Sequence, residues 1–140
     1  MIAYVDSSAV LAWILGEAEG AAVRKHLGRA ERVVSSTLTA IECGRAIARG
    51  ARDGTIGRTD ELAALRLLER AAASWVTLEM TGLVLERARR AFPREPVRTL
   101  DAIHLATVIQ FHEALPDLAV VSLDERVRDN AQALGITVGP

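Results

Sequence analysis

Residues 98–106, with the sequence RTLDAIHLA, are the stretch that decides the fold. Apolar side chains recur at positions 100, 103, 106 and 109, which is the spacing of a helix. Thr99 is suited to cap this helix, and Pro93 and Pro96 discourage an earlier start. Asp101 then lies in the first turn, where the helix dipole favours a carboxylate. Taken alone, Asp101 is explained slightly better as a helix-start acid than as a catalytic group.

Short apolar segments alternate with helical segments on both sides of this stretch. Strands are expected over residues 2–5, 32–35, 75–78, 118–121 and 136–138. Helices are expected over 9–15, 21–30, from 37 to the turn at 53–54, 60–73, 81–91, 99–113 and from 122 to 134. This alternation predicts an α/β fold in one domain over residues 1–140, with a central parallel sheet covered by helices on both faces.

Local patterns add details to these helices. Ser7 and Ser8 are good N-cap residues for the first helix, and Ser122 and Glu125 match a capping box before the last one. Ile41 is expected to face inward from the helix that follows residue 36.

Composition limits the classes of protein to consider. Of the 140 residues, 50% are hydrophobic and 25% are charged, which is typical of a globular chain. No apolar run reaches the ~20 residues that span a bilayer, and residues 1–5 do not form a signal peptide. The single cysteine, Cys43, suits a reducing cytoplasm and is expected to be an unreactive packing residue. The net charge of −1 gives no overall attraction to nucleic acid, so such binding needs local patches.

Acidic side chains collect where the predicted strands end. Asp6 follows the first strand, Asp124 follows the fourth strand, and Glu42 lies one or two turns into the helix after the second. Asp101 opens the helix that leads into the fourth strand. Any one of them has a structural explanation: Asp6 and Asp124 as turn or cap residues, and Glu42 as the partner of Arg45. Ligands of open parallel sheets bind at the carboxyl ends of the strands.

The combination of these acids indicates a metal site. Carboxylates gathered in one cleft repel one another, so they raise their own pKa values or recruit a cation. Hard oxygen ligands suit Mg²⁺ or Mn²⁺. The chemistry that needs such an arrangement is phosphodiester hydrolysis, in which the metal activates water and offsets developing charge.

The same blocks resemble the motifs of a known family. Residues 5–9 (VDSSA), Glu42 after 35–38 (SSTL), 98–106 (RTLDAIHLA) and 121–124 (VSLD) resemble the four motifs of PIN-domain ribonucleases, and most closely those of VapC-type toxins. The resemblance spans nearly the whole chain, and the block around Asp101 is its most specific part. Ser122 stands where family members often have threonine.

This resemblance implies a three-layer α/β/α PIN-like fold and a metal-dependent endoribonuclease that cleaves RNA as the toxin of a type II toxin–antitoxin pair. It implies four catalytic acids, Asp6, Glu42, Asp101 and Asp124, of which Asp6, Asp101 and Asp124 bind Mg²⁺ or Mn²⁺. It also implies a homodimer, a VapB-like antitoxin and a cytoplasmic location, with no membrane partner.

Other functions are compatible with parts of the pattern. A non-toxin RNA-processing nuclease would use the same acids, whereas a catalytically silent PIN-fold binding module would not need all four. A phospho-aspartyl protein could use Asp6, but that chemistry wants a nearby lysine and Lys25 lies in mid-helix.

Residues near the acids have open roles. His104 is expected to be packed or hydrogen-bonded rather than a metal ligand. Arg98 could touch RNA phosphate or brace the acids, and bracing is favoured. The arginines at 45, 49 and 52 form either a phosphate-binding stripe or a solvated face. Trp13 and Trp75 are expected in the core.

Overall fold

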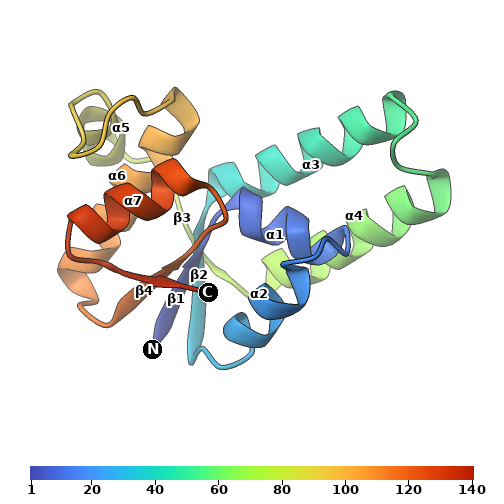
Figure 1. Cartoon of the computed structure of the whole chain (residues 1–140), viewed down its shortest axis with the longest axis horizontal. Coiled ribbons are helices and arrows are strands. Elements are labelled where there is room, and N and C mark those ends of the chain that lie inside the picture. Colours follow the sequence, from blue (N-terminus) through green and yellow to red (C-terminus); the bar gives the residue numbers. More distant parts are fainter.

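Five parallel strands form one sheet at the centre of the chain (Figure 1), in a computed structural model that describes residues 1–140. The strands are β1 (Ile2–Val5), β2 (Arg32–Ser36), β3 (Val76–Leu78), β4 (Leu118–Val121) and β5 (Thr137–Gly139). Their order is β3-β2-β1-β4-β5, which puts β1 between β2 and β4. All four residues of β4 are buried, as are the last three of β1, which explains why both strands are continuous apolar runs.

Seven helices cover the sheet. They are α1 (Ser7–Ile14), α2 (Gly20–Leu27), α3 (Thr37–Arg52), α4 (Arg58–Ala73), α5 (Gly82–Ala88), α6 (Thr99–Ala114) and α7 (Glu125–Ala133). None of these helices combines the length and apolar character that crossing a bilayer requires.

Alternate side chains of β1 point to two separate cores. Tyr4 packs with Leu105 of α6 and Val127 of α7 in one core. Val5, on the opposite face, packs with Val10 of α1, and this second core includes residues of α2, α3 and α4. Because adjacent strand residues face opposite ways, the sheet is a middle layer with helices on both sides. The predicted α/β fold with a covered parallel sheet is confirmed.

Helices α3 and α4 pair as a long hairpin that extends past the sheet (Figure 1). Only part of each helix therefore meets a core. Ile41 of α3 is 56% exposed, so the prediction that it faces inward is wrong, whereas Cys43 and Ile47 are buried.

Three helix starts differ from the predicted caps, and two involve candidate acids. Asp6 caps α1 by accepting a hydrogen bond from the Ala9 N–H, so neither Ser7 nor Ser8 is the cap. Asp124, and not Ser122, caps α7 by accepting from the N–H groups of residues 126 and 127. The hydroxyls of Ser8 and Ser122 do not cap these helices because they take part in other hydrogen bonds. Helix α6 begins after Arg98 and has no side-chain cap, so the Thr99 cap is also wrong.

Candidate active site

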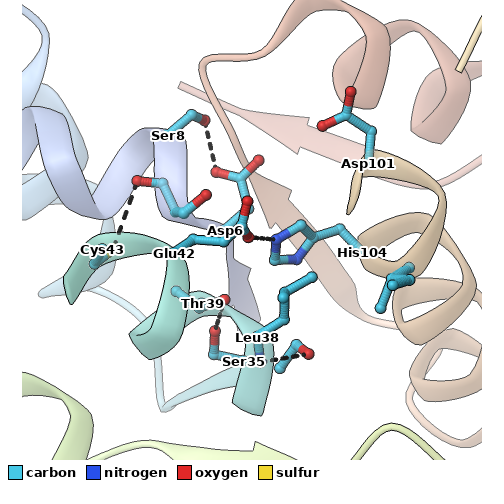
Figure 2. Close-up of polar contacts among 12 residues, drawn as sticks. Asp6, Ser8, Ser35, Leu38, Thr39, Glu42, Cys43, Asp101 and His104 are labelled. Atoms are coloured by element: carbon cyan, nitrogen blue, oxygen red, sulfur yellow. Dashed lines mark hydrogen bonds and ion pairs between the residues drawn. The ribbon is translucent and has the colours of Figure 1, made fainter. Parts of the chain in front are cut away.

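The four candidate acids come from elements that meet at the carboxyl end of the central strands. Asp6 directly follows β1, and Asp124 follows β4 after two residues. Glu42 lies on α3, the helix after β2, and Asp101 lies in the first turn of α6. Figure 2 shows Asp6 and Glu42 on the side of α1 and α3, and Asp101 on the side of α6.

Asp6 is the most buried of these acids, with 2% of its surface exposed. One carboxylate oxygen accepts from the Ser8 hydroxyl at 2.6 Å and from the Ala9 N–H at 3.2 Å, and the other accepts from the Ser122 hydroxyl at 2.5 Å. Burial raises the pKa of Asp6 above its ordinary value, while the charge that His104 carries when protonated and these hydrogen bonds oppose the rise. The cause is therefore desolvation, and not the mutual repulsion of acids that the sequence suggested.

Asp101 and Asp124 share one cationic partner. The guanidinium of Arg98 donates from Nε to Asp101 at 3.0 Å and from Nη2 to Asp124 at 3.2 Å. The pKa of Arg98 is raised, first by the hydrogen bond and charge of Asp101, then by the charge of Asp124, and least by that of Glu42. Arg98 thus braces the acids, as predicted, and it stands as a cation among three carboxylates.

Glu42 does not pair with Arg45. Its Oε1 atom lies 2.5 Å from Nε2 of His104, and Nδ1 of His104 lies 2.7 Å from the Tyr4 hydroxyl. His104 is therefore hydrogen-bonded, as expected. Burial, followed by the charges of Asp6 and Glu42, raises the pKa of Tyr4 well above its usual value.

Several hydroxyl groups at this edge were not recognised from the sequence as functional. Ser122 donates to Asp6 and accepts from the Asp124 N–H at 3.1 Å, so it links two of the acids. Ser8 donates to Asp6 and accepts from the Leu123 N–H at 2.9 Å. The signal available in the sequence is position: both serines lie two residues from a candidate acid.

The remaining candidates lie away from the acids or inside the protein. Trp13 and Trp75 pack against the core beside α1, as expected. Arg52 pairs with Asp53 at 2.9 Å at the far end of α3. Cys43 is buried, and desolvation raises the pKa of its thiol to about 12, which makes it unreactive as predicted.

A divalent cation suits the chemistry of this edge, although no three acidic, histidine or cysteine side chains converge closely enough to hold one. The donors are carboxylate oxygens, the ligands that Mg²⁺ and Mn²⁺ prefer. Asp101 and Asp124 already share a cation, the Arg98 guanidinium. Glu42, Arg98 and Asp101 line a pocket of about 320 Å³ at this edge. The carboxylate oxygens match a divalent ion in chemistry, and Arg98 occupies the place between Asp101 and Asp124 where such an ion would have to sit.

Comparisons with known proteins agree on one family. A family model described as the PIN domain matches residues 3–133. The chain is 36% identical to Ribonuclease VapC46 of Mycobacterium tuberculosis over 136 residues, covering 96% of this chain and 94% of that protein. It is 33% identical to Ribonuclease VapC35 of the same species over 137 residues, covering 96% and 93%.

A solved structure supports the fold. The crystal structure of Mycobacterium tuberculosis VapC20, described as a sarcin–ricin loop cleaving toxin, is similar with a TM-score of 0.67 at 19% identity. The similarity covers 99% of both chains.

Proposed function

Because this chain belongs to the PIN-domain family and is a VapC-type ribonuclease toxin, we propose that it cleaves RNA with Mg²⁺ or Mn²⁺ bound by Asp6, Asp101 and Asp124. The observation that carries this proposal is the Arg98 guanidinium, which bridges Asp101 and Asp124 at the edge where Asp6 and Glu42 also lie. Three carboxylates that raise the pKa of one cation are arranged to attract another.

The four acids have two roles in this proposal. Asp6, Asp101 and Asp124 hold the ion, and the Ser8 and Ser122 hydroxyls keep the Asp6 carboxylate in place. When bound, the divalent ion supplies positive charge to the phosphate and lowers the pKa of a water molecule. Glu42 accepts a hydrogen bond from the attacking water and orients it. Arg98, released from the acids and 66% exposed, is then free to contact RNA phosphate.

Cleavage by the Asp101→Asn variant tests the proposal. The variant keeps the size of the side chain but removes a charged ligand, so metal-dependent cleavage of single-stranded RNA falls by more than the roughly 10- to 100-fold typical of outer-shell partners. The matched control is Asp129→Asn, which changes an exposed acid of α7. Full activity of Asp101→Asn in purified form would contradict the assigned site.

VapC-type toxins act on RNA and are made with an antitoxin, and we propose where the antitoxin binds. A groove of about 660 Å³ lies between α1, α3 and α4. Its apolar lining includes Ile14, Ala46, Ile56 and Leu67, and its charged residues are three acids, Glu17, Asp53 and Asp60, and one arginine, Arg49. These residues suit an amphipathic antitoxin helix with basic residues at its margins. A following Arg or Lys would then reach the acids at the sheet edge.

We also propose a cytoplasmic homodimer. An RNA-cleaving toxin acts where cellular RNA is found. Helix α5 packs on α6, and Leu83, Leu85 and Leu100 of these two helices are 69%, 45% and 46% exposed. Three exposed leucines on two helices that pack against each other favour a protein–protein interface, and a second copy of the chain is the partner we assign to them.

A further inference from the structure

A buried line of three side chains connects β1, α6 and α3 behind the acidic edge. Tyr4 and His104 are 0% and 2% exposed. The Tyr4 hydroxyl lies 2.7 Å from His104 Nδ1, and His104 Nε2 lies 2.5 Å from Glu42 Oε1. Figure 2 shows the His104 ring between the Glu42 carboxylate and the body of α6. Tyr4 and His104 are 100 positions apart in the sequence, and Glu42 and His104 are 62 positions apart.

When the His104 ring is neutral, the hydrogens in this line have one direction that satisfies every member. An ionised carboxylate only accepts hydrogen bonds, so Nε2 of His104 donates to Glu42. Nδ1 is then the ring's acceptor, and the Tyr4 hydroxyl donates to it. The Tyr4 bond therefore selects the tautomer that presents N–H to Glu42.

Packing holds the histidine ring in this orientation. The Tyr4 and His104 rings meet edge to face, with centroids 6.1 Å apart and planes at 74°. Phe111, two helical turns beyond His104 on α6, supports Tyr4 with ring centroids 6.4 Å apart. A ring held by a core neighbour and by hydrogen bonds at both nitrogens is a rigid support for whatever it binds.

The second carboxylate oxygen of Glu42 is available to bind a water molecule. Oε1 is bound to His104, whereas Oε2 takes part in no hydrogen bond, and the Glu42 side chain is 20% exposed. Glu42 lines the same pocket as Asp101 and Arg98. Fixing Oε1 thus fixes where Oε2 can meet a water molecule in that pocket.

We propose that His104 is a positioning residue for Glu42 in RNA cleavage, and that Tyr4 holds His104 in the tautomer and orientation this task needs. The proposal rests on the proposed function, because it takes Glu42 to act on the attacking water. It assigns His104 no contact with metal or RNA. A purely structural His104 would instead fill the core and would tolerate any replacement that preserves packing.

Two substitutions of His104 separate these roles. The amide nitrogen of glutamine lies near the position of Nε2, and that of asparagine lies near the position of Nδ1. His104→Gln keeps the donor to Glu42 and retains kcat close to that of the unmodified protein. His104→Asn loses it, and kcat falls by roughly 10- to 100-fold, as for other outer-shell partners, with KM for single-stranded RNA unchanged. Tyr4→Phe, which removes only the hydroxyl, also lowers kcat.

Controls distinguish positioning from folding. His112→Gln and His112→Asn alter another histidine of α6 that contacts none of the acids, and both retain kcat. The Tm of each His104 variant shows how much stability is lost. When kcat is expressed per folded molecule, the difference in kcat between His104→Gln and His104→Asn remains. The double variant His104→Asn with Glu42→Ala is no slower than Glu42→Ala alone, because the two residues act as one unit.

A readout independent of cleavage completes the test. In ¹⁵N NMR of the unmodified protein, His104 is protonated at Nε2, and Glu42→Ala shifts that signal. Equal kcat values for His104→Gln and His104→Asn, or multiplied losses in the double variant, would overturn the positioning role. Full cleavage by Asp101→Asn would instead contradict the proposed metal site. The comparison of His104→Gln with His104→Asn and the NMR signal test the positioning role separately.

Discussion

Asp6 serves the fold and the proposed chemistry with one side chain, and the two roles conflict. It caps α1 and accepts two hydroxyl hydrogen bonds, yet it is a carboxylate with 2% of its surface exposed. Burial raises its pKa, which means that the folded protein favours the protonated form. The stability from this group is fully present below the unfolded pKa of about 3.9 and is lost as pH rises through the folded pKa. Without metal, ionised Asp6 therefore weakens the fold at neutral pH.

The Asp6→Asn variant tests whether the charge of Asp6 destabilises the fold at neutral pH. Asparagine is also a good N-cap residue and carries no charge, so in EDTA we expect the variant to have a higher Tm than the unmodified protein at pH 7.5. The gain shrinks as pH is lowered through the raised folded-state pKa of Asp6, because Asp6 then becomes protonated and loses its charge. A difference of 1 kcal/mol moves the Tm of a chain of this size by roughly 2–8 °C, which melting curves resolve. A lower Tm at pH 7.5, or a difference independent of pH, would contradict the account.

At the scale of elements, the pairing of α3 and α4 leaves a groove beside α1 that the sheet does not fill. Leu67 of α4 lines this groove, whereas Leu65 of the same helix is 39% exposed and lies outside it. We expect Leu67→Arg to weaken binding of the VapB-like antitoxin by about tenfold or more, the loss typical of a central interface residue. Leu65→Arg is the matched control. Titration calorimetry measures both, and equal affinities would place the antitoxin elsewhere.

The elements also show what sequence reasoning can reach. Strands β1 and β4 were predicted because buried parallel strands are continuous apolar runs, and the acids were brought to one edge by topology alone. Helix caps were missed at α1 and α7 because serine and aspartate are equally good caps, and only tertiary contacts show that Ser8 and Ser122 bond elsewhere. The contact between Glu42 and His104 was missed because it joins separate helices, and periodicity reports only on contacts within an element.

At the scale of the whole molecule, both cores share one sheet, and we propose that residues 1–140 form a single domain. A single cooperative unfolding transition, the same by circular dichroism and by fluorescence, is the expected result. Two transitions would contradict it.

The proposed dimer belongs to the same scale. We expect sedimentation of the unmodified protein to give twice the mass of the 15.1 kDa chain. Leu83→Arg puts a charge on the exposed α5 surface and shifts the protein toward the monomer, whereas Leu62→Arg, on the exposed part of α4, does not. A monomeric unmodified protein, or a dimer unaffected by Leu83→Arg, would contradict the assigned surface.

Binding of Mn²⁺ tests the central claim, that the acids around Arg98 hold a divalent ion, most directly. Electron paramagnetic resonance counts the Mn²⁺ bound by the purified protein without requiring that RNA be cleaved. We predict bound Mn²⁺ in the unmodified protein and in Asp129→Asn, and a loss of binding in Asp101→Asn and in Asp6→Asn. Equal Mn²⁺ binding by all four proteins would contradict the account.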